Sequence, residues 1–194
     1  MSYKITIFHD TDAESPRESC DNLGHMVCWH RRSNLGDETV NPEEYGAEPE
    51  SVLPNAKGLI YLPLYLYEHG EQTMNTSGFS CGWDSGQVGW IYATPEHVRK
   101  HMQWKNITEA RREHVLKCLR AEVEEYSQYL MGHTYGFKIE NEQHCGHCGQ
   151  TINSDDVESC WGFIGDDIES NGILDCVPEE LYEMARVAMQ NINY

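Results

Sequence analysis

The sequence is short of basic residues and of long apolar runs. Among 194 residues, 14 are Lys or Arg and 32 are Asp or Glu, so the formal net charge is −18. Direct binding to duplex DNA needs a basic footprint that neutralises phosphates. A membrane-spanning helix needs about 20 consecutive apolar residues, and no stretch approaches this length. We therefore expect neither direct duplex DNA binding nor a membrane partner.

Familiar catalytic signatures are missing as well. The sequence has no Gly-x-x-x-x-Gly-Lys phosphate loop, no His-Glu-x-x-His motif and no Gly-x-Ser-x-Gly turn. It also lacks the N-terminal apolar segment of a secretory signal peptide, so we expect a cytoplasmic protein with reduced cysteines. These absences favour a binding protein and leave open an enzyme with another kind of site.

The acidic residues are unevenly distributed. Residues 132–180 hold eleven Asp and Glu and one base, Lys138, whereas residues 94–131 hold six acids and seven bases. Dense like charges destabilise a compact state through repulsion, so the cluster suggests a basic partner. Solubility or a bound divalent cation are the alternatives. The partner-binding residues that we expect are Asp155, Asp156, Glu158, Asp166, Asp167 and Glu169.

Helices are indicated by apolar spacing and by start signals. Apolar residues recur at three- and four-residue steps from Val115 onwards, which predicts a long amphipathic helix. It should begin at Thr108, a good N-cap residue, and end near Gly132. Thr94 opens a shorter helix, and Pro178 opens a C-terminal one.

The remaining apolar stretches have the length and alternation of strands. Strands and helices follow one another without regular βαβ alternation, which favours the α+β class. We expect a single domain over residues 1–194, in which a mainly antiparallel sheet packs against one long and one C-terminal helix, with long loops. The last two strands should form a hairpin with an insertion at its tip, at about residues 141–157. The predicted strands are residues 3–8, 23–30, 59–68, 88–92, 135–139 and 158–164, with a short return strand at 72–77.

Two segments suggest a ligand site. Residues 78–92 combine glycines with Cys, Trp and Asp before a β-prone stretch, which is typical of a shaped loop on a rigid sheet. Residues 28–32 place a thiol, an imidazole and two arginines together, for binding phosphate or carboxylate or for ion pairs with the surplus acids. The alternative function is therefore a small-ligand or nucleotide-binding protein or enzyme. Its site residues would be His30, Arg31, Arg32, Cys81, Trp83, Asp84 and Gln87.

A Cys-Gly-x-Cys-Gly turn lies within the predicted hairpin tip. Cys145 and Cys148 have the spacing that aims two thiolates at one metal ion, and tetrahedral zinc takes four N or S ligands. His144 or His147 would supply a third ligand. No second Cys-x-x-Cys exists, so a pair of free or oxidisable thiols is the alternative. Zinc is the one cofactor that the sequence predicts.

Six blocks of the sequence are distinctive: residues 15–18, 23–32, 34–37, 62–67, 79–89 and 159–163. They resemble a family of uncharacterised proteins found in bacteriophages and other mobile elements. The resemblance covers most of the chain, and Gly82 stands where the family has a proline. It implies a phage or mobile-element origin and a role against host functions, and it implies no catalytic residue.

Charge and resemblance together predict a small acidic accessory protein of a phage or mobile element. It would bind and inhibit a host defence protein through that protein's basic surface, in the cytoplasm of the host cell. Nucleic-acid mimicry, as in acidic anti-CRISPR and antirestriction proteins, is one way to achieve this.

Overall fold

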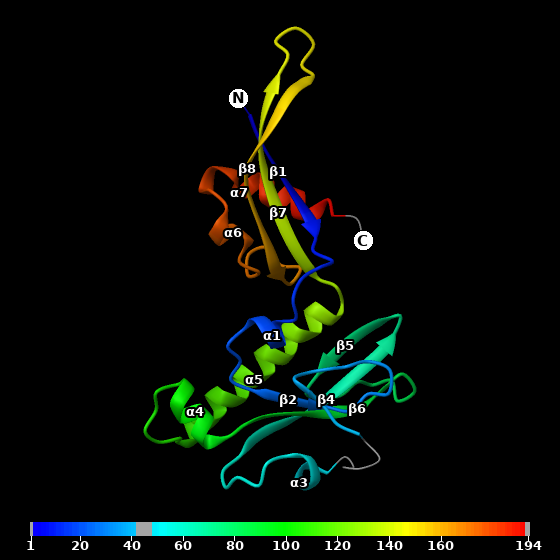
Figure 1. Cartoon of the computed structure of the whole chain (residues 1–194), viewed down its shortest axis with the longest axis vertical. Coiled ribbons are helices and arrows are strands. Elements are labelled where there is room, and N and C mark those ends of the chain that lie inside the picture. The colour runs from blue at the N-terminus through cyan, green and yellow to red at the C-terminus, as the bar shows by residue number, and fades with distance from the viewer. Residues whose placement is uncertain (1, 42–47, 193–194) are drawn as a thin grey trace. The chain divides into compact units, whose positions relative to one another are not determined.

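The protein has a mixed α+β fold with mainly antiparallel sheets, as the sequence predicted (Figure 1). The structure is a computed structural model that describes residues 2–41 and 48–192. The chain divides into two compact units: unit 1 comprises residues 1–14 and 132–194, and unit 2 comprises residues 15–131. The length of the chain predicted a single domain, whereas the described residues bury two separate apolar clusters, one in each unit.

Unit 2 contains a five-stranded sheet against which a long helix packs. The strand order is β3-β2-β6-β4-β5, and among the described strands only the short pair β2 and β3 is parallel. The elements are α1 (Pro16–Ser19), β2 (His25–Cys28), β3 (Glu38–Thr39), α3 (Pro49–Val52), β4 (Ile60–His69), β5 (Glu71–Asn75), β6 (Ser85–Ala93), α4 (Pro95–His101) and α5 (Glu109–Leu130).

The predicted long helix is α5, and its ends follow the local signals. The Thr108 hydroxyl accepts a hydrogen bond from the Arg111 backbone N–H, and Gly132 adopts the left-handed conformation with φ 76° just beyond the helix. Val115, Leu119 and the other members of the apolar stripe are buried in the core of unit 2. Each such side chain stabilises the fold by about 1.5–3 kcal/mol. Within the described residues, no helix combines the length and apolar character needed to span a membrane.

An ion cluster around the buried Arg17 connects α1, the start of β2, the loop before β3, and α5. The Arg17 side chain is 2% exposed, and its Nε and Nη2 atoms donate to the Asp37 carboxylate at 2.9 and 2.7 Å. Its Nη1 atom donates to Glu122 at 2.9 Å. The two carboxylates also accept backbone N–H groups, Asp37 from Met26 at 2.6 Å and Glu122 from Gly24 at 3.1 Å. Every charge is therefore compensated by ion pairs and hydrogen bonds.

Unit 1 contains a three-stranded antiparallel sheet with strand order β1-β7-β8. Its helices pack against one face, where Ile5, Tyr135, Phe137 and Ala185 form part of the buried cluster. Successive strand residues point to opposite faces, so the other face carries Gly136, Lys138 and Glu140 of β7. The elements are β1 (Ser2–His9), β7 (Thr134–His144), β8 (Thr151–Ile164), α6 (Ile173–Cys176), the 3₁₀ helix η1 (Glu179–Leu181) and α7 (Tyr182–Gln190).

The segment expected as an insertion, at about residues 141–157, instead continues the hairpin. The ladder between β7 and β8 runs from Thr134 opposite Ile164 to His144 opposite Thr151, with three register shifts. Residues 151–159 are all exposed, so no face of this part of the strand needs apolar residues. The regular alternation of apolar and polar residues that would predict a strand is therefore missing here. Only residues 145–150 remain as a turn.

The ion cluster generates a stability prediction. Replacing Arg17 with Met should lower the free energy of unfolding of unit 2 by up to about 3–5 kcal/mol, because the part-buried carboxylates of Asp37 and Glu122, 15% and 14% exposed, then lose their shared cation. Urea denaturation followed by tryptophan fluorescence measures this, since Trp161 is the one tryptophan outside unit 2. Arg99→Met is the matched control, because Arg99 is exposed on α4 and should change stability by less than about 0.5 kcal/mol. Equal losses in both variants would contradict the role of the cluster.

Candidate functional site

The glycine-rich stretch forms a loop before β6, as expected. Hydrogen bonds between backbone groups and polar side chains hold the loop in place. The Gly78 N–H donates to the Asn75 side chain at 2.7 Å, and the Ser85 hydroxyl donates to the Cys81 carbonyl. At the end of the loop, the Glu68 N–H of β4 donates to the Asp84 carbonyl at 2.9 Å. The loop therefore presents its side chains beside the end of β4.

Four of the predicted ligand-site residues line one polar pocket of about 240 Å³: His30, Arg32, Trp83 and Asp84. Glu68, which sequence reasoning missed, lies among them and pairs with Arg32 at 3.1 Å and with His30 at 3.8 Å. The His30 side chain is 15% exposed, and its Nδ1 atom has no hydrogen-bond partner in the described chain. Arg32 and Asp84, which are 52 positions apart in the sequence, are thus brought to the same pocket.

The other three ligand-site residues do not line this pocket. Arg31 is exposed outside it, and the Gln87 side chain donates to the Gly89 carbonyl at 3.3 Å. Cys81 lies next to the pocket, where its thiol contacts Asp84 at 3.8 Å. His69 contacts the same Asp84 oxygen at 3.4 Å. The carboxylate thus stands between thiol and imidazole, which is not the order that activates a nucleophilic cysteine.

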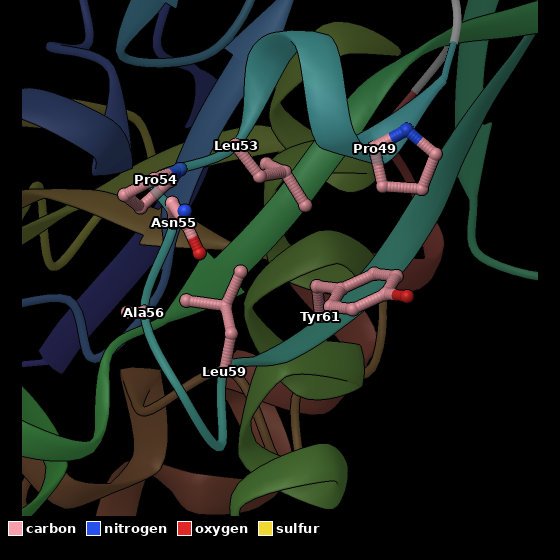
Figure 2. Close-up of a pocket in the computed structure, with 7 residues that line it drawn as sticks. All are labelled: Pro49, Leu53, Pro54, Asn55, Ala56, Leu59 and Tyr61. Carbon is pink, nitrogen blue, oxygen red and sulfur yellow. The ribbon is translucent and has the colours of Figure 1, made fainter.

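A second, more apolar pocket lies between the α3 segment and β4 (Figure 2). Its volume is about 310 Å³, and the side chains of Leu53, Leu59 and Tyr61 surround it. None of its lining residues is charged, and Asn55 supplies the one amide. The pocket therefore has no convergent polar groups of the kind that perform chemistry.

The six predicted acidic residues lie on β8 and in the loop that follows it, and all are exposed. The three in the loop have structural partners. Asp166 accepts the hydroxyl of the fully buried Tyr135 at 2.6 Å and pairs with His133 at 3.0 Å. Asp167 accepts the Glu169 N–H at 3.1 Å and so closes a turn.

Two of the six acids also form ion pairs with a basic side chain of unit 1. Glu169 pairs with Arg186 of α7 at 2.6 Å, and this hydrogen bond lowers the pKa of the Glu169 carboxyl. On β8, Asp156 pairs with Lys138 at 2.7 Å. Asp155 and Glu158 form no ion pair with the described residues, which leaves their charges available to a partner. The six acids therefore divide into those that hold the fold and those that do not.

An exposed aromatic pair on the open sheet face was not predicted. Phe8 and Trp161 both lie opposite Gly136 on neighbouring strands, and their rings stack with centroids 6.0 Å apart. Phe8 is 41% exposed and Trp161 50% exposed. Any side chain at position 136 would collide with the indole ring, so the glycine makes room for it. The glycine within a strand pattern was the one signal in the sequence. The sequence did not show which side chain would lie over this glycine.

The predicted metal turn has two thiols but no complete ligand set. Cys145 and Cys148 lie in the turn between β7 and β8, and their thiols hydrogen-bond each other. Backbone N–H groups of His147 and Cys148 point to the Cys145 sulfur and lower its pKa. In the part of the chain that the structure describes, no group of three or more His, Cys, Asp or Glu side chains is arranged to hold a metal ion.

The cysteine environments predict different reactivities toward iodoacetamide. Cys145 should be alkylated fastest at neutral pH, because the N–H groups that lower its pKa raise the thiolate fraction. Burial raises the pKa of Cys28 to about 12, so roughly 10⁻⁵ of it is ionised at pH 7 and it should react only after unfolding. Peptide mapping by mass spectrometry at timed intervals measures both, with the exposed Cys20 as the comparison. Faster labelling of Cys20 than of Cys145 would contradict the geometry of the turn.

Comparisons with known proteins add no identification. The chain matches no family model, no curated protein and no solved structure. The resemblance to phage and mobile-element proteins therefore enters the proposed function only as an expectation.

Proposed function

We propose that unit 1 is a binding module for a basic protein surface, of the kind that holds nucleic acid in host defence enzymes. The observation that carries this proposal is the concentration of charge. Unit 1 contains 15 Asp and Glu and 3 Lys and Arg, so it accounts for −12 of the net charge of −18. A surface of this sign steers basic partners toward it and repels nucleic acid.

The few basic residues of unit 1 are already matched by acids. Lys4 pairs with Glu142 at 3.8 Å, and Lys138 and Arg186 form the ion pairs described above. Because these pairs use only part of the acidic set, the surplus negative charge has no compensation within the unit. A basic partner would supply the missing positive charge.

The aromatic pair gives the acidic surface an apolar anchor. Exposed tryptophan is among the residues that contribute most to protein interfaces, provided that a partner buries it. Trp161 and Phe8 lie on the sheet face that the helices leave open, and Val157 of β8 is 55% exposed nearby in the sequence.

Asp155 and Glu158 lie on the same edge strand, opposite Asn141 and Ile139, so their side chains point to the face opposite that of Trp161. A partner would reach both sets of side chains along the exposed edge of β8. We propose this part of β8 as the contact surface, in a protein of phage or mobile-element origin that acts in the host cytoplasm.

Removing the two acids without ion pairs should weaken binding and leave the fold intact. The double variant Asp155→Asn, Glu158→Gln should lose roughly 2–30-fold in affinity, since exposed interface charges contribute about 0.2–1 kcal/mol each. Immobilised protein, a bacterial host lysate and graded salt provide the measurement, with captured proteins identified by mass spectrometry. Duplex DNA should displace a partner that is bound by nucleic-acid mimicry. Glu179→Gln, Glu180→Gln is the matched control, with the same charge change at exposed positions of η1.

Two tryptophan variants locate the contact surface in the same assay. Trp161→Ala should reduce capture by at least about 10-fold, the loss typical of a buried interface aromatic. Trp83→Ala should leave it unchanged, although Trp83 is 98% exposed in unit 2. If Trp83→Ala abolishes capture and Trp161→Ala does not, the contact surface belongs to unit 2. Capture that is insensitive to salt contradicts the electrostatic basis of the proposal.

The pocket of unit 2 supports a second function, the binding of a small anionic ligand. Its specific support is the convergence of Arg32, His30 and Asp84 with the exposed Trp83. A phosphate or carboxylate group of the ligand would compete with Glu68 for Arg32, whose side chain is 78% exposed. The nucleobase of a nucleotide would stack on Trp83.

A nucleotide titration tests this second function. Adenosine monophosphate should quench the tryptophan fluorescence of the full chain with a Kd below about 1 mM, and Arg32→Gln should weaken it about 10-fold through loss of a charged hydrogen bond. Arg31→Gln is the control, because Arg31 is adjacent in sequence but outside the pocket. Equal effects of the two arginine variants would indicate non-specific attraction.

A further inference from the structure

The turn at the end of the β7–β8 hairpin holds Cys145 and Cys148 in a defined arrangement. The Cys145 N–H donates to the Gln150 carbonyl and the Gly149 N–H donates to the Cys145 carbonyl, both at 2.8 Å. Gly149 adopts the left-handed conformation with φ 72°, which lets the chain return toward β8. The two thiols are neighbours, and backbone N–H groups point to the Cys145 sulfur. Two neighbouring thiols are half of the ligands that a tetrahedral four-thiolate site requires.

The histidines of the same chain do not complete the site. His144 is the last residue of β7, where Nε2 contacts the Ser2 hydroxyl at 2.8 Å and Nδ1 contacts the Thr151 hydroxyl at 3.4 Å. Both ring nitrogens are therefore engaged away from the thiols. His147 lies between the cysteines, and its backbone N–H donates to the Cys145 sulfur. The described chain offers no third and fourth ligand at this position.

We infer that two copies of this chain share one zinc ion at their hairpin tips, each copy supplying Cys145 and Cys148. A two-fold axis through the metal relates the two turns and gives the four sulfur ligands that structural zinc prefers. Each half-site is incomplete without the other copy. Zinc binding and dimerisation are therefore one event.

The surroundings of the tip allow two copies to approach. Residues 143–154 contain no Asp, Glu, Lys or Arg, although unit 1 is otherwise strongly acidic. The tip projects beyond the helices α6 and α7 of the same unit, so the turn can be reached without contact to them (Figure 1). Ile152 is 70% exposed beside the turn and supplies apolar surface to a tip-to-tip contact.

The chemistry balances without another reactant. One Zn²⁺ replaces up to four thiol protons, which pass to solvent, and the resulting four-thiolate centre carries a charge of −2. The N–H groups that point to each Cys145 sulfur offset part of this charge. No oxidation or reduction occurs, so the thiols must be kept reduced for the metal to bind.

The stoichiometry of zinc and the mass of the particle test the inference. Full-length protein, purified with a reductant that does not bind metal, should take up about 0.5 zinc per chain by elemental analysis. Light scattering after gel filtration should show a dimer with zinc and a monomer after chelation. Cobalt substituted for zinc should give the absorption of a four-thiolate centre, which differs from that of a mixed sulfur and nitrogen site.

Variants of the turn separate the possible ligand sets. Cys145→Ser or Cys148→Ser should abolish both zinc uptake and dimerisation, whereas His144→Ala and His147→Ala should leave them intact. All four positions lie at the exposed tip of the hairpin, outside the buried cores, so the fold should be unaffected, and circular dichroism checks this. One zinc per monomeric chain, loss of zinc in a histidine variant, or no zinc uptake by reduced protein would each overturn the inference.

Discussion

The guanidinium of Arg17 is the group on which the geometry of unit 2 depends. It lies between Asp37 and Glu122, and these two carboxylates hold backbone N–H groups at the start of β2. One buried cation therefore fixes α1, the first residues of β2 and the middle of α5 relative to one another. β2 leads directly into the segment that carries His30 and Arg32, which pair with Glu68. Loss of either carboxylate would leave the buried Arg17 cation with only part of its compensation, which costs stability.

Unit 1 follows a different principle, because its charge is at the surface. Its β8 is an edge strand of fourteen residues, and a long regular edge is a template for pairing with other chains. Three register shifts in its ladder and acids along its length interrupt that template. The same acids give the unit its negative field. Solubility and attraction for a basic partner thus have one physical origin. The aromatic pair of Phe8 and Trp161 adds an apolar contact of defined shape, which charge alone does not provide.

The candidate sites were predictable where their residues are close in sequence. Cys145 and Cys148 form the expected turn because their spacing and the glycine that follows determine its local geometry. Other contributions needed the fold. Glu68 reaches the pocket from β4, and Trp161 meets Phe8 only because β1 and β8 flank β7. The acidic segment shows the same limit, since Asp166 holds the Tyr135 hydroxyl whereas Asp155 forms no ion pair. In the sequence these two residues are equivalent.

The sequence by itself determined the class of fold, the helix ends and the sign of the charge, because caps, apolar periodicity and net charge are local or additive properties. Thr108 and Gly132 mark the ends of α5 correctly for this reason. Only the tertiary structure decided the division into two units, the continuation of β8 beyond its apolar residues and the burial of Arg17. Each of these depends on pairings between distant residues, such as Arg17 with Glu122, which are selected by the free energy of the whole packed core and leave no periodic signal in the chain.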